Sequence, residues 1–425
     1  MIRIGKPYIR DNGDTIALVA SVIDEARNLK TELWYAVEKE FGQYLCVELA
    51  DPFLCAVYEV AMVSGQDISI DAPVSAKFLF HLRNTIQPLF LKLLPGSKIV
   101  DVIVASESDL DFHAKGVGCG CSLGVDSLAS IYAQMDPALP KEYKLTHLAF
   151  FNCGQLGDYE LDKVKENFIQ SQKAVRRFAD EIGYPLITVD TSLNEFYKYC
   201  GVTLLQSFLN RSMSCALALQ KLFRHYVLAS SYPADKITVS SVDQSHMEAV
   251  FVPLHSTENC EFVVGNPMMK RTEKTKYISG YPLTERYLTV CWAEQTAYEV
   301  WHNTQFLEGK TKPNCGWCDK CLRTLLTLDI FGVVENYADQ FDLAKYYEHK
   351  QDYISKIFRE CRKNPFYMEM VELIVSSGWS VDAKLLKKYL SSLKESKYRR
   401  ALRFVGRVVR GVKNRLYSLL KWVGL

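Results

Sequence analysis

Between about Gly116 and Val334 the chain alternates short apolar runs with longer amphipathic segments, and this alternation limits the folds open to it. Leu145–Asn152 is an apolar run of strand length, Asp158–Ile182 is polar and amphipathic, and Leu186–Val189 follows a Gly-Tyr-Pro break as the next predicted strand. Strands that alternate with helices of this length predict a parallel sheet with crossover helices. In such sheets ligands bind at the carboxyl ends of the strands, where the strand order reverses. The sequence therefore predicts an α/β fold with a ligand site at that edge.

The length of 425 residues exceeds one average domain of about 100–150 residues, so several regions are expected. We predict an α/β accessory domain over residues 1–115, the parallel-sheet domain over residues 116–335 and a helical region over residues 336–425. The first region has no cluster of residues of the types that commonly act in catalysis. We therefore expect this region to cap or shape a substrate site. Its predicted strands are Thr15–Val19, Tyr44–Glu48 and Lys98–Ala105, and its predicted helices are Asp51–Ser64 and Val74–Leu93.

The composition excludes several classes of protein. A hydrophobic content of 48% with 24% charged residues excludes a disordered or fibrous chain. The 51 basic and 49 acidic residues give a net charge of +2, which argues against nucleic-acid binding by the whole surface. No run approaches the ~18–20 apolar residues that span a bilayer, and the first residues lack a signal-peptide core. Thirteen cysteines without an export signal favour buried thiols and a few ligands, so we expect a cytoplasmic protein.

A glycine-rich turn stands before a predicted helix at Leu128–Gln134. It includes the run Ser122-Leu123-Gly124-Val125-Asp126-Ser127. A small-residue turn that opens a helix points several backbone N–H groups at one place, and the helix dipole adds about half a positive charge there. Ser122 and Ser127 add hydroxyl donors, and Gly124 lets an anion such as phosphate approach closely. The alternative is a glycine-rich turn in which a serine merely caps the helix.

The run Ser122–Ser127 resembles the SGGxDS signature of the PP-loop ATP pyrophosphatases, with Leu123 in place of the first glycine. Those enzymes split ATP between the α and β phosphates and transfer AMP to an oxygen of the substrate. The later turn Phe151-Asn152-Cys153-Gly154-Gln155, followed by a helix, a strand and Asp190, resembles one branch of them, the 7-cyano-7-deazaguanine synthases of queuosine biosynthesis. The resemblance implies a Rossmann-like PP-loop core. It also implies an ATP site formed by Ser122, Leu123, Gly124, Val125, Asp126, Ser127, Asn152, Gly154 and Gln155.

Three cysteines at three-residue steps, Cys315, Cys318 and Cys321, lie 24 residues and more after Cys291. A CxxCxxC knuckle with one distant partner supplies the four thiolates of a tetrahedral structural zinc site. The alternatives are reactive thiols, an iron–sulfur cluster, or buried cysteines that bind no metal. The CGxCxxC run with a following arginine, here Arg323, also resembles the deazaguanine synthases, in which a distant cysteine is the fourth zinc ligand. The resemblance then covers residues 116–330, about half of the chain.

Four cations crowd the start of a predicted helix in the run Lys270-Arg271-Thr272-Glu273-Lys274-Thr275-Lys276, with Thr272 as the predicted N-cap. This placement opposes the preference of the helix dipole for acids, and it is favourable if a pyrophosphate or carboxylate neutralises the cations. PP-loop enzymes place a basic residue at a helix start near the phosphates, so the resemblance implies this role for Arg271 and Lys274. A solvated basic face is the alternative.

Polar residues follow a predicted strand at Tyr226–Ser230, and a further short strand is predicted at Lys236–Ser240. Ser231, Tyr232 and the run Asp243–His246 would face a substrate if they lie at the carboxyl end of the sheet. Asp, Ser and Gln are also common turn formers, which is the alternative.

From Arg399 to Leu425 apolar residues recur every three or four positions, and the basic residues fall largely between them. This pattern predicts an amphipathic basic helix that lies on an anionic membrane surface, peripheral to the inner membrane face, or docks on a protein partner. The alternative is a helix that packs on its own domain with its basic residues in solvent.

The resemblance implies an ATP-dependent ligase. Magnesium-ATP would bind at Ser122–Ser127, and a carboxylate or amide oxygen of a small molecule or macromolecule would attack the α-phosphorus. Arg271 or Lys274 would offset the charge on the leaving pyrophosphate, and Asp126 would help to hold magnesium. The adenylate would then react with an amine or ammonia to give an amide or a nitrile.

Alternative functions remain open at this stage. Leu123 is compatible with a nucleotide-binding subunit that turns over weakly, as in polysaccharide-biosynthesis or antiphage assemblies, where the family also has relatives. An adenylylsulfate-type reductase would need a terminal cysteine, and the sequence ends in Gly424-Leu425. A nucleic-acid binder would use the basic tail, with an affinity that falls steeply with salt. The acceptor and the oligomeric state do not follow from the sequence.

Overall fold

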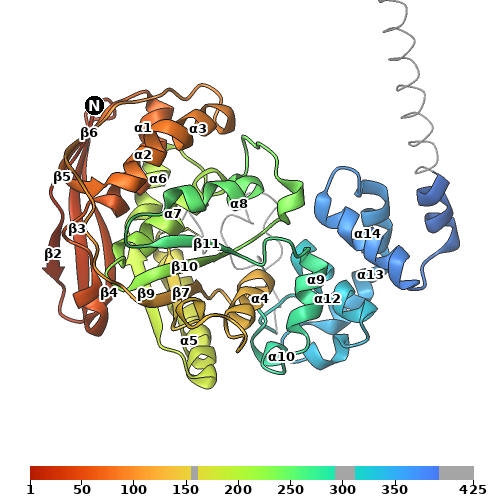
Figure 1. Ribbon diagram of the computed structural model, residues 1–425. Coiled ribbons are helices and arrows are strands. Elements are labelled where there is room, and N and C mark those ends of the chain that lie inside the picture. The colour runs from red at the N-terminus through yellow and green to blue at the C-terminus, as the bar shows by residue number, and fades with distance from the viewer. Residues whose placement is uncertain (155–160, 292–311, 392–425) are drawn as a thin grey trace, which may run out of the picture. The chain divides into compact units, whose positions relative to one another are not determined.

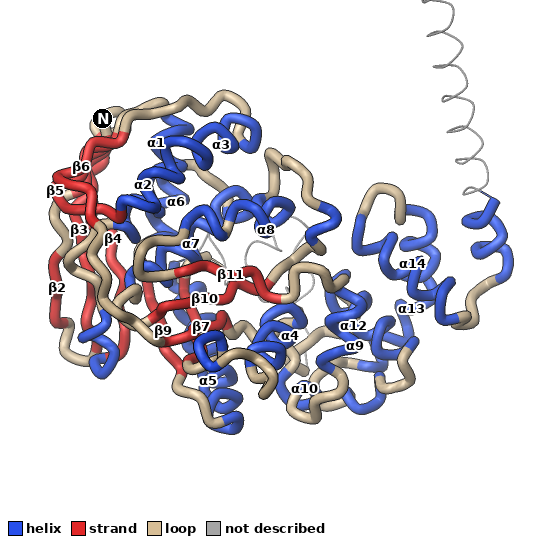
Figure 2. Tube along the Cα trace, viewed as in Figure 1, coloured by secondary structure: helices blue, strands red, loops and turns tan. Residues whose placement is uncertain are grey.

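The computed structural model of the protein describes residues 1–154, 161–291 and 312–391, with the backbone alone over residues 161–167 (Figure 1). The chain divides into two compact units, Met1–Glu348 and His349–Leu425. The larger unit is an α/β structure with one central sheet and helices on its faces (Figure 2). The predicted α/β class with a mostly parallel sheet is confirmed.

The described part of the larger unit contains one sheet of eleven strands, in the spatial order β11-β10-β7-β8-β9-β4-β3-β1-β5-β6, with β2 paired to β3. The strands from β11 to β9 are mutually parallel, as are β1, β5 and β6. Strand β4 joins the two groups by antiparallel pairing with β9 and β3. The strands are β1 Ile2–Ile4, β2 Tyr8–Asp11, β3 Thr15–Asp24, β4 Leu29–Glu38, β5 Ile68–Ser75, β6 Val102–Ser108, β7 Gly116–Gly120, β8 His147–Asn152, β9 Leu186–Thr191, β10 Phe223–Ala229 and β11 Glu261–Gly265.

The strand order reverses at β7. From β7 the chain passes through helix α4 (Val125–Gln134) to β8 and through α5 (Leu161–Ile182) to β9, and it then crosses to β10 and β11 on the other side of β7. Helices α4 and α5 lie on one face of these strands, whereas α7 (Leu204–Ala218) and α8 (Glu248–Phe251) lie on the other (Figure 1). The loops that leave β7 and β10 thus turn to opposite faces. This is the place where doubly wound sheets bind their ligands.

The central strands are apolar because helices cover both of their faces. All residues of β8 except His147 are buried, and the register pairs Phe151 with Val189 and Asn152 with Asp190. Fully buried parallel strands have continuous apolar runs instead of alternating ones. This explains why the sequence predicts β8 and β9 well, each to within two residues at either end.

One hydrophobic core extends from the amino-terminal strands to β10 and β11. Helix α1 (Asp51–Ser64) lies inside it, buried on nearly all sides from Asp51 to Met62. It packs against α7, where the hydroxyl of Tyr58 donates to Oδ1 of Asn210 (3.1 Å). The boundary predicted at residue 115 therefore falls between two parts of one sheet and one core, and the first compact unit continues to Glu348.

The bounds of α1 match the predicted helix Asp51–Ser64, which begins with Pro52 in its first turn and ends at Gly65 in the left-handed conformation (φ 64°). The predicted helix Val74–Leu93 is interrupted by a π-helical turn at Leu82–Ile86. The other helices of this unit are α2 Ala76–His81, α3 Gln87–Leu93, α6 Leu193–Cys200, α9 Arg271–Ile278, α10 Thr284–Tyr287, α12 Asp319–Ile330 and the first turns of α13 Leu343–Glu360.

Two predicted strands are wrong. Residues 45–48 pair with no described strand, and the N–H of Cys46 instead donates to the carbonyl of Ala218 at the end of α7 (2.9 Å). Residues 237–240 form an irregular, largely exposed segment in which the N–H of Thr238 donates to the carbonyl of His246 (3.2 Å). Both runs have suitable side chains, but neither pairs with a strand in the part of the chain that the structure describes.

The second unit, His349–Leu425, is helical in its described part, as predicted for the carboxyl-terminal region. It holds the remainder of α13, helix α14 (Pro365–Ser377) and a further helix over residues 383–391. Asn364 caps α14 by accepting the N–H of Phe366 (3.0 Å), and Gly378 ends it at φ 68°. The predicted basic helix at residues 399–425 lies outside the described residues. Among the helices that the structure describes, none has the length and apolar character needed to cross a membrane.

Candidate functional site

The predicted phosphate loop joins β7 to α4 at the reversal of strand order. Strand β7 ends at Gly120, and α4 begins at Val125 with Gly124 as its N-cap residue. Cys121 donates its N–H to the carbonyl of Ala149 (2.8 Å), which continues the pairing of β7 with β8. The first amides of α4 have no partner inside the helix, as at every helix start. The loop therefore presents main-chain donors at this edge, and Gly124, not a serine, is the cap.

The hydroxyl of Ser127 closes the loop from inside. It accepts hydrogen bonds from the N–H (3.3 Å) and the hydroxyl (3.1 Å) of Ser122, and it donates to the carbonyl of Gly124 (3.1 Å). Ser127 is buried, whereas Ser122 is exposed. Ser127 therefore shapes the loop, and Ser122 is the hydroxyl of this pair that a ligand can reach.

Leu123 has a left-handed backbone conformation, with φ at 58°. This conformation costs a residue with a Cβ about 1–2 kcal/mol, whereas glycine adopts it freely. The Leu123 side chain is only 2% exposed, and its carbonyl accepts the N–H of Thr289 (2.9 Å). Burial of the side chain and this hydrogen bond together stabilise the conformation. The leucine side chain is packed inside the protein.

Asp126, Arg271 and Lys274, the three residues predicted to act on the phosphates, lie together. Asp126 stands in the first turn of α4, and both cations stand in the first turns of α9. The guanidinium of Arg271 lies 2.6 Å from Oδ2 of Asp126, and Nζ of Lys274 lies 3.3 Å from Oδ1. The Lys274 side chain has no exposed surface. Because both carboxylate oxygens of Asp126 contact cations, this residue anchors the start of α9 to the phosphate loop.

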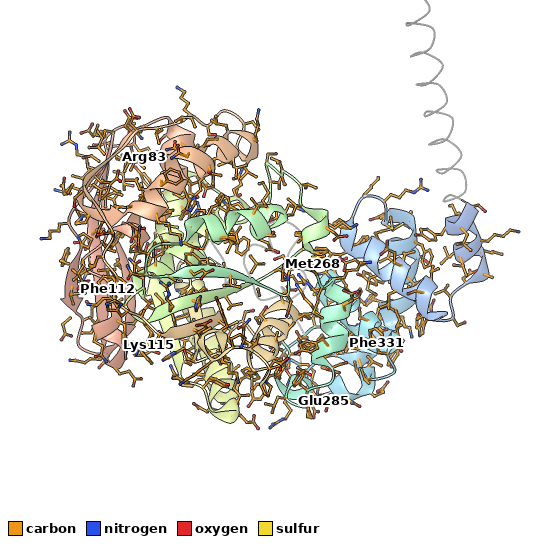
Figure 3. The ribbon with its side chains drawn as sticks, in the orientation of Figure 1. Arg83, Phe112, Lys115, Met268, Glu285 and Phe331 are labelled. Atoms are coloured by element: carbon orange, nitrogen blue, oxygen red, sulfur yellow. The ribbon has the colours of Figure 1, made fainter. Side chains whose placement is uncertain are left out.

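Helix α9 begins at Arg271 with Lys270 as its N-cap residue, so the predicted N-cap at Thr272 is wrong. Glu273 explains the earlier start, since its carboxylate accepts the backbone N–H of Lys270 (2.8 Å) from the third helical position. The turn between β11 and α9 carries Met268, which is 66% exposed (Figure 3). The helix start that bears the cations is thus held by its own acid and by Asp126.

Ser230 and Glu248 belong to the same site, although Glu248 has no sequence signal. Ser230, directly after β10, accepts hydrogen bonds from Nζ of Lys274 through its carbonyl and its hydroxyl, the latter at 2.7 Å. Oε1 of the Glu248 carboxyl group accepts the N–H groups of Ser231 and Tyr232 in the next turn. Glu248 is 3% exposed, and its second oxygen has no hydrogen-bond partner. Burial raises the pKa of Glu248 to about 8, so this carboxyl holds a proton at neutral pH.

Tyr232, whose N–H donates to Glu248, is also influenced by two arginines. Its ring stacks on that of His246 with centroids 4.0 Å apart. Burial raises the pKa of Tyr232 to about 12, and the charges of Arg271 and Arg323 oppose this rise. Both arginines also act on Lys320, whose pKa is lowered to about 7 by burial and then by their charges. The charges of Arg271 and Arg323, from different helices, thus influence both Tyr232 and Lys320.

The polar residues after β10 are mostly used for local structure. Asp243 accepts the N–H of Ser245 (2.9 Å) and so starts a short helical turn, and Gln244 accepts the N–H of Leu209 in α7 (3.2 Å). Both support the turn-former alternative for these positions.

The predicted adenosine turn follows β8. The Asn152 amide is engaged within the protein, since it donates to Asp190 (2.7 Å) and accepts from Asn194 (3.4 Å). Gly154 has a φ of 124°, and a Cβ there would lie 2.7 Å from the guanidinium of Arg211. Asn152 therefore ties the ends of β8 and β9 together, and the backbone of Gly154 fills a space that admits no side chain. Gln155, also predicted at this site, lies outside the described residues.

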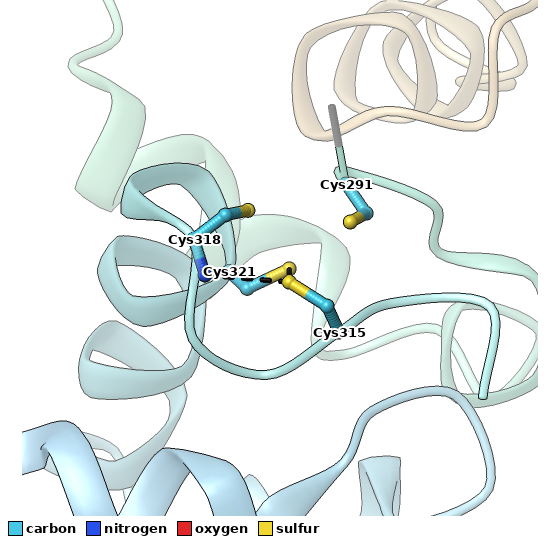
Figure 4. Close-up of side chains that lie close together, drawn as sticks. All are labelled: Cys291, Cys315, Cys318 and Cys321. Atoms are coloured by element: carbon cyan, nitrogen blue, oxygen red, sulfur yellow. Dashed lines mark hydrogen bonds between the residues drawn. The ribbon is translucent and has the colours of Figure 1, made fainter. Parts of the chain in front are cut away.

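The four cysteines predicted as metal ligands form one cluster (Figure 4). The Sγ atoms of Cys291, Cys315, Cys318 and Cys321 all lie within 4.8 Å of one another, with 3.9 Å between those of Cys315 and Cys321. Tetrahedral bonds of about 2.3 Å from zinc place sulfur atoms about 3.8 Å apart. Three of the cysteines are buried and Cys291 is half-buried. Figure 4 shows the sulfur of Cys291 directed toward the other three. The cluster therefore has the donors and the spacing to bind a metal ion such as zinc.

Local backbone geometry builds the cluster. Cys318 is the N-cap of α12, its N–H donates to Sγ of Cys315 (3.3 Å), and Cys321 lies in the first turn of this helix. Hydrogen bonds from the other three thiols lower the pKa of Cys291 well below its usual range. A thiolate is thus favoured at Cys291, and thiolate is the form that binds metals.

Asn314, which carries no functional signal in the sequence, joins this cluster to the predicted phosphate loop. It is fully buried, and its Oδ1 accepts the N–H groups of Val290 (2.8 Å) and Cys291 (3.0 Å). Its amide donates to the carbonyl of Leu288 (2.9 Å). Thr289, inside the segment that Asn314 holds, is the residue that donates to the carbonyl of Leu123. One short segment therefore contacts both the cysteine cluster and the predicted phosphate loop.

Comparison of the chain with protein-family models, with curated proteins and with solved structures gives no match.

Proposed function

We propose that the protein binds magnesium-ATP at the loop Ser122–Ser127 and transfers its AMP group to a carboxylate or amide oxygen, with release of pyrophosphate. The observation that carries this proposal is the contact of Arg271 and Lys274 with Asp126 in the first turn after that loop. Residues far apart in the chain thereby place two cations beside a main-chain anion site. Phosphate groups are the ligands that such a combination favours.

Two further features support the proposal. The loop leaves β7 where the strand order reverses, which is where doubly wound sheets bind nucleotides. Its sequence and the cysteine knuckle also resemble the PP-loop deazaguanine synthases, so a Rossmann-like PP-loop core is part of the proposal. Zinc is the metal that we propose for the four cysteines, because four thiolates in tetrahedral spacing suit it and it has no redox chemistry.

In this account each part of the site has one task. The amides at the start of α4 and the hydroxyl of Ser122 bind the phosphates. Arg271 and Lys274 offset the charge that develops on the leaving pyrophosphate, where preorganised cations contribute most. Asp126 fixes both cations, and help in holding magnesium stays a prediction for the same residue. A carboxyl adenylate then reacts with an amine or ammonia to give an amide and AMP, whereas an adenylated amide loses AMP and protons to give a nitrile.

The test is incubation of the full chain with magnesium and ATP labelled at the α-phosphate, with and without panels of carboxylic acids, amides and ammonium. AMP and pyrophosphate in equal amounts, dependent on an acceptor, support the proposal. Exchange of labelled pyrophosphate into ATP would further show that an adenylate forms.

A second candidate is a nucleotide-binding subunit without turnover, favoured by the conformation of Leu123. A leucine held in a left-handed backbone by burial and by Thr289 gives a more rigid loop than glycine would. This candidate predicts saturable ATP binding with no AMP or pyrophosphate under any condition. The tail at residues 399–425 would then serve to attach the subunit to an anionic membrane surface or to a protein partner.

A further inference from the structure

A pocket of about 560 Å³ lies at the carboxyl-terminal ends of α4 and α9. Sites for small molecules typically have volumes of about 300–1,000 Å³. The two helices pack side by side (Figure 1), and their amino-terminal ends carry Asp126 and Arg271 of the proposed phosphate site. Tyr132 and Tyr277, which line the pocket, each stand six residues further along their helix, a rise of about 9 Å. The pocket is therefore separate from the phosphate site.

Three tyrosine rings form the aromatic part of the pocket. The ring of Tyr281 stacks on that of Tyr132, with centroids 3.8 Å apart, and it meets the ring of Tyr277 at 72°, with centroids 5.5 Å apart. Tyr277 and Tyr281 thus form two walls that stand nearly at right angles. Burial raises the pKa of Tyr132 and of Tyr277, so both stay neutral phenols at neutral pH. The face of such a ring attracts a cation that lies within about 6 Å of its centroid.

Asp136 adds a negative charge to the same pocket. It lines the pocket two residues after the end of α4, and its charge contributes to the raised pKa of Tyr277. Its Oδ1 accepts the N–H of Ala138 (2.8 Å), and the structure records no ion pair between Asp136 and another described residue. The last turn of α4 contains no basic residue. A helix end carries about half a negative charge, which a cation normally offsets. The acid and the helix end therefore both favour a cation here.

The protein itself does not supply that cation within the pocket. The described residues that line it include no Lys, Arg or His. Lys144 donates to the carbonyl of Pro137 at the rim (2.8 Å) but is not part of the lining. Lys276, in the last turn of α9, lies over the ring of Phe331, 5.0 Å from its centroid. An anionic ligand would meet a carboxylate and the negative faces of the rings, so the electrostatics oppose it.

We infer that this pocket binds a small organic ammonium ion with an apolar body. The charged nitrogen would lie beside Asp136 and against the rings of Tyr277 and Tyr281. The apolar body would contact the aliphatic part of the lining, which includes Ile182 and Leu283. The inference does not rest on the proposed function, because the phosphate site lies at the opposite ends of both helices.

The experiment compares four ligands that share one benzyl or phenyl group and differ in charge: benzylamine, benzyltrimethylammonium, benzyl alcohol and benzoate. Each is titrated into the metal-loaded full chain in a calorimeter. Asp136→Asn removes the charge and keeps the oxygen that accepts the N–H of Ala138, and Tyr277→Leu removes one wall. Asp382→Asn is the matched control, because Asp382 also accepts the N–H of the second residue after it (2.7 Å, from Lys384) but does not line the pocket. The thermal unfolding midpoint shows whether each variant keeps its fold.

Both ammonium ions should bind the wild type with a Kd of about 1 mM or lower, which is reasonable for ligands of this size. Benzyl alcohol and benzoate should bind at least about tenfold more weakly. Asp136→Asn and Tyr277→Leu should each weaken benzylamine binding about threefold or more, and Asp382→Asn should bind it as the wild type does. No binding of benzylamine, equal binding of benzylamine and benzyl alcohol, or wild-type affinity in either pocket variant would overturn the inference. Tighter binding of benzoate than of benzylamine would also overturn it.

Discussion

The Nζ atom of Lys274 lies 3.3 Å from Oδ1 of Asp126, and the two residues are 148 positions apart in the chain. One stands in the first turn after the phosphate loop and the other in the first turns of α9. Lys274 also donates to Ser230, directly after β10. This one side chain therefore contacts segments from both sides of the strand-order reversal.

Asp126→Asn should destabilise the fold more than Lys274→Met does. Removal of the acid leaves two cations without their shared partner, and removal of one partner from a buried ion pair costs about 3–5 kcal/mol. Asp126 retains 20% exposure, so about 2–3 kcal/mol is expected. Lys274→Met leaves Asp126 with Arg271 and should cost about 1–2 kcal/mol for the lost hydrogen bonds to Ser230. Urea unfolding measures the loss of stability in both variants.

The control is Glu181→Gln, at an exposed pair with Arg286, which should change the free energy of unfolding by less than about 1 kcal/mol. Equal costs for the Asp126 and Lys274 variants would contradict the assigned role of Asp126.

Glu248→Gln should remove a pH dependence of stability. The pKa of Glu248 in the folded chain is about 8, above the value of about 4.3 expected in an unfolded chain. The folded state therefore holds a proton that the unfolded state has lost. The contribution of Glu248 to stability is full below about pH 4.3, falls as the pH rises, and is lost once the pH passes about 8. Between these two pH values the free energy of unfolding of the wild type should fall by up to about 1.4 kcal/mol per pH unit relative to that of Glu248→Gln.

The glutamine variant keeps an oxygen that accepts the N–H groups of Ser231 and Tyr232. Parallel pH profiles for the two chains, measured by urea unfolding, would show that Glu248 ionises normally.

Cys318→Ser should lower the bound metal well below one ion per chain and should lower the thermal unfolding midpoint. Structural zinc contributes to folding directly, and loss of one of four thiolates weakens the site strongly. Elemental analysis and thermal unfolding measure the two effects. Cys200→Ala is the control, because this cysteine is also buried but lies on α6, outside the cluster. Full metal content in Cys318→Ser, or no metal in the wild type purified with zinc, would count against the metal site. Iron with visible absorption would indicate an iron–sulfur cluster instead.

Gly154→Ala should destabilise the fold by about 2 kcal/mol more than Gly183→Ala. Both glycines have positive φ, at 124° and 75°. A Cβ at Gly154 would lie 2.6 Å from Leu204 and 2.7 Å from Arg211, whereas a Cβ at Gly183 meets nothing within 4 Å. The first substitution therefore adds steric overlap to backbone strain, and the second adds strain alone. Similar free energies of unfolding for the two variants would mean that the turn after β8 has room to move.

Local patterns were enough to predict much of the fold. Helix α1 has a proline at its start and a glycine at its end, and β8 is an uninterrupted apolar run, so both have nearly the predicted bounds. The cysteine cluster follows from its spacing, because three of the four ligands lie within one short turn. The contact of Asp126 with Arg271 and Lys274 agrees with the place expected for these residues at the carboxyl edge of the sheet.

Long-range contacts explain what the sequence did not predict. The antiparallel pairing of β4 with β9, which joins the first 115 residues to the parallel strands, leaves no pattern within either strand. Each of Glu248, Thr289 and Asn314 forms hydrogen bonds with main-chain groups that are distant in the sequence. The residues next to them in the chain give no indication of these bonds. The prediction of a strand at Tyr44–Glu48 was wrong for the same reason, since a suitable run that pairs with no other strand does not form one.

The most direct test of the central claim is titration calorimetry of magnesium-ATP into three chains: the wild type, Arg271→Met and Arg286→Met. Arg271 contacts Asp126 beside the loop, whereas Arg286 is an exposed arginine paired with Glu181. We expect saturable binding at one site in the wild type, at least about tenfold weaker binding in Arg271→Met, and unchanged binding in Arg286→Met. Absence of ATP binding in the metal-loaded wild type, or equal binding by all three chains, would contradict it.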